Sequence, residues 1–283
     1  MRVAIAATKL ADKLNIYSWR VPGTEGEGSV INCKSLTEAL CGAVAVILPL
    51  PASLDGALLN CKAESEEEKT FIKEIIDIMD AGCILIGGKL PIWVGDYAAN
   101  KDIRTFDYFE SESFQIKNAY TTAEAALNIA MNSLLKNIRC AKFAITGYGR
   151  ISKQLVKLLR GLDAEVAVAA RKDSDLAWAD LCGCKTINIS NPKRVYEMSS
   201  GYDVIFNTVP YMLFDESFLA SVDKRTILIE LASSPGGIDV SAAKKMKSAV
   251  LWAASLPGKY APESAGELIA DCVEDIIHAE GIL

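Results

Sequence analysis

Two glycines, Gly147 and Gly149, lie between an apolar strand end and a helical pattern in the stretch "AITGYGRISKQLVKLL", which runs from residue 144 to residue 159. A strand-like run precedes them and a helical pattern follows, as in the turn that binds the pyrophosphate of a dinucleotide. Gly147 permits the tight turn. Gly149 lets a phosphate approach the backbone, where the start of the helix offers N–H groups and a positive dipole end. Ser152 occupies the third position of the motif, which needs a small side chain. The same turn also occurs without a ligand, but this context favours a dinucleotide.

The strand that follows the turn indicates which dinucleotide fits. The segment "AEVAVAARKD" ends in Ala170, Arg171 and Lys172. A site for NAD would carry Asp or Glu near Ala170 to accept from the ribose 2′-hydroxyl, and that carboxylate would repel a 2′-phosphate. Arg171 and Lys172 would instead pair with a 2′-phosphate. We therefore predict NADP(H) as the cofactor, although two basic residues can also simply solvate a loop.

Two further strand ends carry small and polar residues: "IFNTVP" at 205–210 and "ILIELASSPGG" at 227–237. Ligands of such folds bind in the crevice outside the carboxyl ends of the strands. Asn207 can otherwise serve as a turn former, and the proline–glycine segment as a plain loop. The predicted cofactor-binding residues are Gly147, Tyr148, Gly149, Arg150, Ile151, Ser152, Arg171, Lys172, Asn207, Thr208, Val209, Pro210, Leu231 and Ala232.

The elements around these motifs alternate between strands and helices. In the first half, apolar runs at 3–6, 43–48 and 83–87 predict buried strands, and "EEEKTFIKEIIDIMDAG" predicts an amphipathic helix between the last two. "VPGTEGEGS" at 21–29 predicts an exposed loop. This alternation indicates parallel sheets with helices on their faces.

In the second half, a capping box of Thr121 and Glu124 predicts the start of a long connecting helix. The stretch from 263 to 279 predicts a final helix with one apolar stripe. Strands are predicted at 143–146, 166–170, 186–189, 204–207, 226–231 and 249–253.

The chain has 283 residues, more than one hydrophobic core usually organises. We predict an α/β fold of two Rossmann-like domains with parallel sheets: a substrate domain at 1–119 and an NADP-binding domain at 120–262. The segment "LPGKYAP" breaks the second sheet, so the apolar stripe of the last helix needs a new surface. We expect the helix of 263–283 to pack back on the N-terminal domain.

Composition excludes several classes of protein. Hydrophobic residues make up 51%, charged residues 23%, and the net charge is −6, as in an ordinary globular protein. The acidic balance argues against nucleic-acid binding. The most apolar stretch near the N-terminus, "AVAVILPLP", is far shorter than the roughly 20 residues of a membrane span. The N-terminal residues lack the pattern of a secretory signal. We expect a cytoplasmic protein that binds neither nucleic acid nor membrane.

Eight cysteines are scattered along the chain, and we expect them to be reduced and mostly buried. Cys182 and Cys184 form the one close pair, without a second pair at metal-ligand spacing. We predict no metal, with a zinc or redox role for this pair as the alternative to plain packing.

The motifs together carry a family resemblance. It rests on "GYGR", "AARK", "FNTVP", "LIELASSPGG", "LPGKYAPESAG" at 256–266 and "NAYTTAEAALNIAM" at 118–131. The sequence resembles the A subunit of bacterial dipicolinate synthase, with which spore-forming bacteria make dipicolinic acid. It departs from the family pattern at residues 6–8, where the family has Gly-Gly-Asp, and at Glu230, where the family has Asp.

The resemblance implies NADP-dependent oxidation of a dihydrodipicolinate-type precursor to dipicolinate during sporulation. It also implies a small dicarboxylate substrate and, as partner, the second, flavin-binding subunit of dipicolinate synthase. We further expect a homo-oligomer.

A dicarboxylate substrate needs cationic donors, and aromatisation needs a proton acceptor. Lys259, beside a helix start that favours anions, is the candidate for binding a carboxylate, unless it is an ordinary surface lysine. Glu124 and Glu230 are the candidate bases, although the capping box also explains Glu124. Thr122 and Ser233 are candidates to orient the ring by hydrogen bonds, as are the neighbouring residues Thr121 and Ser234.

The single histidine, His278, distinguishes between enzyme classes. A 2-hydroxy-acid dehydrogenase commonly uses a histidine–carboxylate pair as its acid–base group, and His278 lies late in the last helix, away from every predicted strand end. That class therefore ranks second. A non-catalytic NADP-binding protein that supports a catalytic partner is the third hypothesis.

Overall fold

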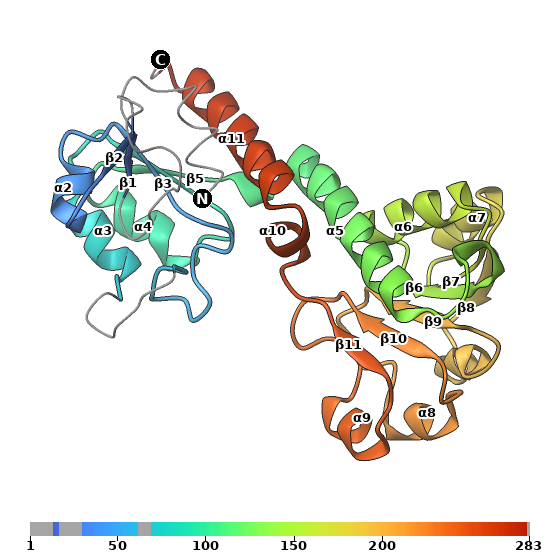
Figure 1. The fold of residues 1–283 in the computed structure, drawn as a ribbon. Helices are drawn as coiled ribbons and strands as arrows, with labels where there is room; N and C mark the ends of the chain where they lie inside the picture. The colour runs from blue at the N-terminus through green and yellow to red at the C-terminus, as the bar shows by residue number, and fades with distance from the viewer. Residues whose placement is uncertain (1–13, 17–29, 62–68, 282–283) are drawn as a thin grey trace. The chain divides into compact units, whose positions relative to one another are not determined.

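The computed structural model describes residues 14–16, 30–61 and 69–281. The chain divides into two compact units (Figure 1): one comprises the residues up to Lys117 together with those from Pro262 onward, and the other runs from Asn118 to Ala261. Every pair of neighbouring strands described within the sheets is parallel. The predicted fold class, α/β with Rossmann-like parallel sheets, is confirmed.

The first unit is built on a three-stranded sheet in the order β3-β4-β5, with a separate pair of strands, β1 and β2. Apolar side chains of α3 and α4 cover the sheet, including Ile72, Ile76 and Val94, which are fully buried. The elements are β1 (Leu14–Ile16), β2 (Val30–Asn32), α2 (Leu36–Leu40), β3 (Ala45–Ile47), α3 (Ile72–Ile78), β4 (Ile84–Gly87), α4 (Trp93–Ala99), β5 (Arg104–Asp107), the 3-10 helix η2 (Tyr108–Glu110) and α11 (Pro262–Ala279).

The C-terminal helix α11 belongs to this first unit, although the whole second unit separates it in sequence from the rest. Its apolar stripe contributes Leu268, Val273 and Ile277 to a core cluster that also holds Ile84 and Tyr108. Near the end of the helix, Glu280 forms an ion pair with Arg104 of β5. The chain thus completes the core of its first unit with its last helix.

The second unit contains a six-stranded sheet in the order β11-β10-β9-β6-β7-β8. From β6 the chain first builds outward through β7 and β8, then returns to the other side of β6 and builds through β9, β10 and β11. The strand order reverses between β6 and β9, and ligands of open α/β sheets bind at the carboxyl ends of the strands beside such a reversal.

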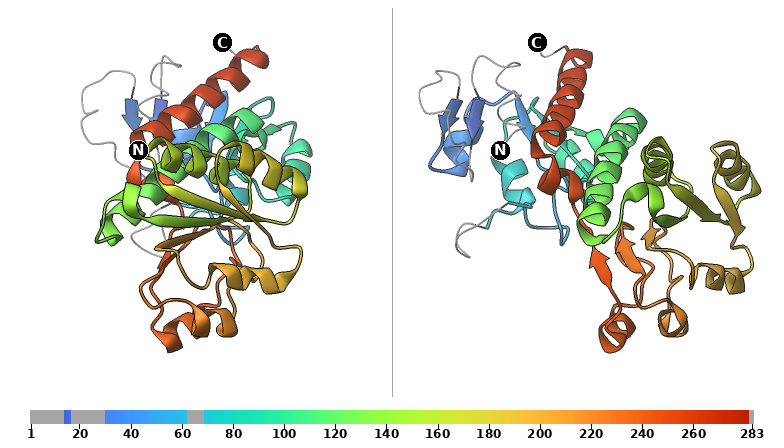
Figure 2. Two further views of the ribbon diagram at one scale, coloured as in Figure 1. Left: turned by 90° about the vertical axis from the view of Figure 1, so that its right-hand side faces the viewer. Right: turned by 45° about the vertical axis from the view of Figure 1, so that its right-hand side comes forward.

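Helices cover both faces of this sheet (Figure 2). Residues of α5, α6 and α7 pack on one face, and residues of η4, α8 and α9 on the other. The elements are α5 (Glu112–Ser133), which begins in the first unit, the 3-10 helix η3 (Ile138–Cys140), β6 (Lys142–Thr146), α6 (Arg150–Gly161), β7 (Glu165–Ala170), α7 (Asp173–Leu181), β8 (Lys185–Asn188), the 3-10 helix η4 (Pro192–Met198), β9 (Val204–Asn207), α8 (Glu216–Ser221), β10 (Ile227–Glu230), α9 (Val240–Met246), β11 (Val250–Trp252) and α10 (Leu256–Tyr260).

The strands predicted from residue 43 onward are confirmed, with ends that differ by at most two residues. The predicted strand at 3–6 and the predicted loop at 21–29 lie outside the described residues. The sequence patterns missed β1, β2, β5 and α4, which are short and carry mixed polar and apolar residues.

The predicted helix start at Thr121 is wrong, because α5 is continuous from Glu112. Phe114 and Ala119 are buried on the same helix ahead of Thr121. Thr121 and Glu124 therefore lie inside the helix and cap nothing. Within the described residues, no helix is both long enough and apolar enough to cross a membrane.

Candidate functional site

The glycine turn connects β6 to α6 in the second unit. Gly147 has a φ of +78°, a backbone conformation that glycine adopts without strain. A Cβ atom at Gly147 would lie 2.9 Å from Thr208 Oγ1 and 3.0 Å from Val209 Cγ2. Gly149, the N-cap of α6, is exposed, and a Cβ there would meet no atom within 4 Å. The first glycine is thus required by the fold, whereas the space beside the second is open to a ligand.

Ser152 links the turn to the neighbouring strand end. Its side chain is fully buried, and its Oγ lies 2.9 Å from Thr208 Oγ1. The Thr208 hydroxyl donates to the carbonyl oxygen of Thr146 at 2.7 Å, so its proton is already used and Ser152 is the donor to Thr208. The third motif position therefore both packs closely and fixes the start of the 208–210 loop.

The end of β7 lies beside the glycine turn, because the Gly147 N–H donates to the carbonyl oxygen of Ala169 at 2.8 Å. Arg171 and Lys172 follow at once, and both are exposed. Neither side chain forms an ion pair with a carboxylate among the described residues. The Arg171 backbone is held by the Ser190 hydroxyl, which donates to its carbonyl oxygen at 2.9 Å. Two uncompensated positive charges thus stand at the place where the fold would put a 2′-phosphate.

A buried polar network joins the ends of β6, β9 and β10. The Thr146 hydroxyl donates to Asn207 Oδ1 at 2.5 Å, and Asn207 Nδ2 donates to both carboxylate oxygens of Glu230, at 2.8 and 2.9 Å. The backbone N–H groups of Ala232 and Gly237 donate to the same carboxylate, at 2.9 and 2.8 Å. The exposed fraction is 0% for Thr146 and Asn207 and 1% for Glu230. Both carboxylate oxygens are saturated by donors.

This geometry argues against Glu230 as a general base. A base must reach the proton that it removes. The Glu230 carboxylate is enclosed, and each of its oxygens accepts two hydrogen bonds from the protein. The burial and hydrogen bonds of Glu230 favour a structural role over that of a proton acceptor.

The other candidates for substrate chemistry are separate from this network. Glu124 lies exposed in the middle of α5, and Thr122 donates its hydroxyl to the carbonyl oxygen of Asn118 at 2.8 Å within the same helix. Ser233 is exposed in the loop after β10. Lys259, on α10, is also exposed, and its ammonium donates to the carbonyl oxygen of Ala254 at 2.9 Å. No hydrogen bond or ion pair described here joins these side chains to the glycine turn.

Comparison with known proteins supports the family resemblance. Residues 2–109 match the family model for the N-terminal domain of the A subunit of dipicolinate synthase. The chain is also 27% identical over 232 residues to the A subunit of dipicolinate synthase from Bacillus subtilis (strain 168), covering 82% of this chain and 77% of that relative. Both comparisons confirm the resemblance to the A subunit of dipicolinate synthase.

Solved structures share the fold of this chain. The crystal structure of the dipicolinate synthase A subunit from Bacillus halodurans superposes with a TM-score of 0.82 at 22% identity, covering 98% of this chain and 93% of that one. The transhydrogenase from Sinorhizobium meliloti superposes with a TM-score of 0.67 at 15% identity, covering 97% and 89%. At these identities the likeness shows a shared fold alone.

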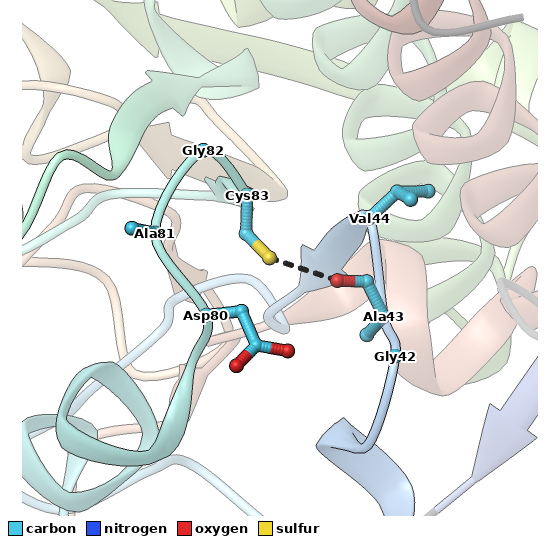
Figure 3. Close-up of a pocket in the computed structure, with 7 residues that line it drawn as sticks. All are labelled: Gly42, Ala43, Val44, Asp80, Ala81, Gly82 and Cys83. Carbon is cyan, nitrogen blue, oxygen red and sulfur yellow. Dashed lines mark hydrogen bonds between the residues drawn. The ribbon is translucent and has the colours of Figure 1, made fainter.

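A pocket of about 400 Å³ in the first unit lies away from the carboxyl ends of the strands. Figure 3 shows its lining, residues 42–44 and 80–83, which precede β3 and β4. The Cys83 thiol donates to the carbonyl oxygen of Ala43 at 2.8 Å, and burial raises the pKa of that thiol. The pocket holds none of the predicted site residues. In the described part of the chain, no three His, Cys, Asp or Glu residues gather as metal ligands.

Sequence reasoning missed two residues of the polar network, Thr146 and Gly237. Thr146 is a polar residue at the end of an otherwise apolar strand, and that contrast was its signal. Gly237 looked like part of a plain loop, but a Cβ there would lie 2.5 Å from Asn207 Nδ2. No local pattern predicts a contact between residues so far apart in the sequence.

Proposed function

We propose that this chain binds NADP and takes part in the oxidation of a dihydrodipicolinate-type ring to dipicolinate. The observation that carries the proposal is the pairing of an open glycine turn with two exposed cations, Arg171 and Lys172, that no described carboxylate neutralises. The likeness to the relative from Bacillus subtilis suggests the substrate class, because that relative is the A subunit of a dipicolinate synthase.

The residues present fit NADP. The backbone of 147–152 would hold the pyrophosphate, since the space beside Gly149 is open and α6 starts there. Arg171 and Lys172 would pair with the 2′-phosphate. Because the adenosine half would lie over β7, the nicotinamide half would extend to the other side of β6, over the 207–210 and 231–232 loops.

The bound NADP would accept a hydride from the ring. The ring loses one hydride and one proton, so the products are dipicolinate, NADPH and a proton. The chain's own part is to bind and orient the substrate. Lys259 is our candidate for a substrate carboxylate, because its ammonium is exposed and its one described hydrogen bond goes to a neutral carbonyl. Thr122 and Ser233 would orient the ring, and exposed Glu124 remains the candidate proton acceptor.

We propose the flavin-binding second subunit of the synthase as the partner, by analogy with the family. Alcohol–ketone chemistry on the 2-hydroxy-acid dehydrogenase pattern has less support. His278, which that chemistry would use, is exposed near the end of α11, with its Nε2 3.7 Å from Glu274 Oε1.

Direct titration of the protein with NADPH and with NADH, followed by calorimetry, tests the cofactor proposal. We expect saturable binding of one dinucleotide per chain, with NADPH favoured over NADH by at least about tenfold, since one charge-assisted hydrogen bond contributes roughly 1.5–3 kcal/mol. Equal affinity for NADPH and NADH would contradict the assignment to NADP.

A further inference from the structure

We propose that Glu230 is a positioning residue: together with Asn207 it sets the shape of the two loops that would line the nicotinamide half of the cofactor. This inference rests on the proposed binding of NADP. It concerns the loops after β9 and β10, on the opposite side of β6 from Arg171.

The Glu230 carboxylate ties three parts of the chain together. Oε1 accepts from Asn207 Nδ2 and from the Ala232 N–H, and Oε2 accepts from Asn207 Nδ2 and from the Gly237 N–H, all within 2.8–2.9 Å. Each of these described contacts to the carboxylate is a hydrogen bond donated by an amide NH₂ group or a backbone N–H group. An ionised carboxylate accepts at both oxygens, whereas an amide of the same shape would turn an NH₂ group toward one of these donors.

Asn207 has no freedom to rotate its amide. Its Oδ1 accepts from the Thr146 hydroxyl and from the Val209 N–H, at 2.5 and 3.2 Å, while its Nδ2 donates to Glu230 and to the Val209 carbonyl oxygen at 3.0 Å. The pair therefore fixes the start of the 207–210 loop relative to the end of β6, where the glycine turn begins.

Gly237 shows how closely the loop after β10 is held against this pair. A Cβ at Gly237 would lie 2.5 Å from Asn207 Nδ2, 2.6 Å from the Tyr211 carbonyl oxygen and 2.8 Å from the Val209 carbonyl oxygen. The Gly237 carbonyl oxygen accepts from the N–H groups of Leu213 and Phe214, at 3.0 and 2.9 Å. Loss of the carboxylate would release both loops at once.

Because the cofactor has two halves, a test can distinguish a local change in the two loops from a general loss of structure. NADP covers both sides of β6, whereas adenosine 2′,5′-bisphosphate has no nicotinamide half and would need only the Arg171 side. We expect Glu230→Gln to weaken NADP binding about tenfold or more, as one unsatisfied buried hydrogen bond would. The affinity for adenosine 2′,5′-bisphosphate should change less than about twofold, because the Arg171 side is untouched.

Two further variants complete the experiment. Glu216→Gln makes the same chemical change in an exposed carboxylate that pairs with Lys245, and it should leave both affinities unchanged. Glu230→Asp keeps a carboxylate on a shorter side chain, and it should bind NADP more tightly than Glu230→Gln.

Each outcome supports or overturns either the NADP function or the positioning role of Glu230. If the unaltered protein binds neither ligand, the proposed NADP function fails. If it binds both, and Glu230→Gln weakens both equally or neither, the positioning role is overturned while the NADP function stands. If Glu230→Gln does not fold, Glu230→Asp is measured with the same two ligands, and it should weaken the binding of NADP more than that of adenosine 2′,5′-bisphosphate. If Glu230→Asp also fails to fold, or if it weakens both equally or neither, the positioning role is overturned as well.

Discussion

Arg171 and Lys172 give the end of β7 a positive charge that nothing in the described part of the chain neutralises. Ala170 ahead of them is buried and carries no carboxylate that would accept from a ribose 2′-hydroxyl. The nearby Asp173 is directed elsewhere, since its Oδ1 accepts from Asn188 Nδ2 at 2.9 Å. These individual side chains favour a 2′-phosphate over a 2′-hydroxyl.

Arg171→Asp should therefore abolish or invert the preference for NADPH. The exchange removes a cation and adds a carboxylate that repels the 2′-phosphate, so we expect NADPH affinity to fall at least about tenfold, while NADH affinity holds or rises. Calorimetric titration with both cofactors checks this. Lys224→Asp makes a similar charge change at another exposed site of the same unit and should have no effect. An unchanged preference in Arg171→Asp would show that its guanidinium does not face the cofactor.

Lys259→Ala should weaken the use of substrate and spare NADPH binding. The ammonium of Lys259 is exposed and bonded only to a neutral carbonyl, so its charge remains available to a carboxylate. We expect KM for the ring substrate to rise about tenfold, the size of one charge-assisted bond. Lys259→Arg keeps the charge and should recover most of the loss. A variant with unchanged KM would identify Lys259 as an ordinary surface residue.

Among the secondary-structure elements, the turn between β6 and α6 contains two glycines with different roles: one is needed for folding, and the other leaves space for a ligand. Gly147 has a positive φ and close neighbours, so the fold itself requires glycine there. Gly149 has a φ of −82° and open space where a Cβ would stand. No described neighbour within the protein requires the absence of a side chain at Gly149.

Gly149→Ala accordingly tests the turn as a ligand site. The added methyl group meets no protein atom, so the loss of thermal stability should be limited to the modest cost of alanine at an N-cap position. It would occupy the space of the pyrophosphate, and NADP affinity should fall at least about tenfold, by analogy with other close backbone–phosphate contacts. Gly161→Ala, at the end of the same helix and equally free of neighbours, is the matched control. Tight NADP binding by Gly149→Ala would place the phosphate elsewhere.

Spacing and periodicity predicted the glycine turn, the strands of the second unit and the stripe of α11, because each of these is a local pattern. They did not predict β5, "RTFD", because this strand has only four residues and both of its ends are polar. The pattern of Thr121 and Glu124 also fits a helix interior, and here the buried Phe114 extends the helix past it. The role of Glu230 depends on Asn207 and Gly237, which approach it only in the folded chain.

In the molecule as a whole, the chain returns to its first unit at the end, so that this unit is formed from both ends of the sequence. The second unit, residues 118–261, is an insertion with its own sheet and core. We propose that the second unit carries NADP and that the first contributes to substrate binding. Both units are then required for turnover.

Participation of this chain in NADP-linked formation of dipicolinate can be measured directly. The assay supplies freshly made dihydrodipicolinate precursor and NADP to the protein, with and without the proposed flavin-binding partner, and follows dipicolinate by its ultraviolet absorbance. We predict dipicolinate formation well above the uncatalysed rate in at least one mixture, with one NADPH appearing for each dipicolinate. Formation only with the partner, and without NADPH, would assign this chain a binding role instead of catalysis. If neither mixture exceeds the uncatalysed rate, the proposed function is contradicted.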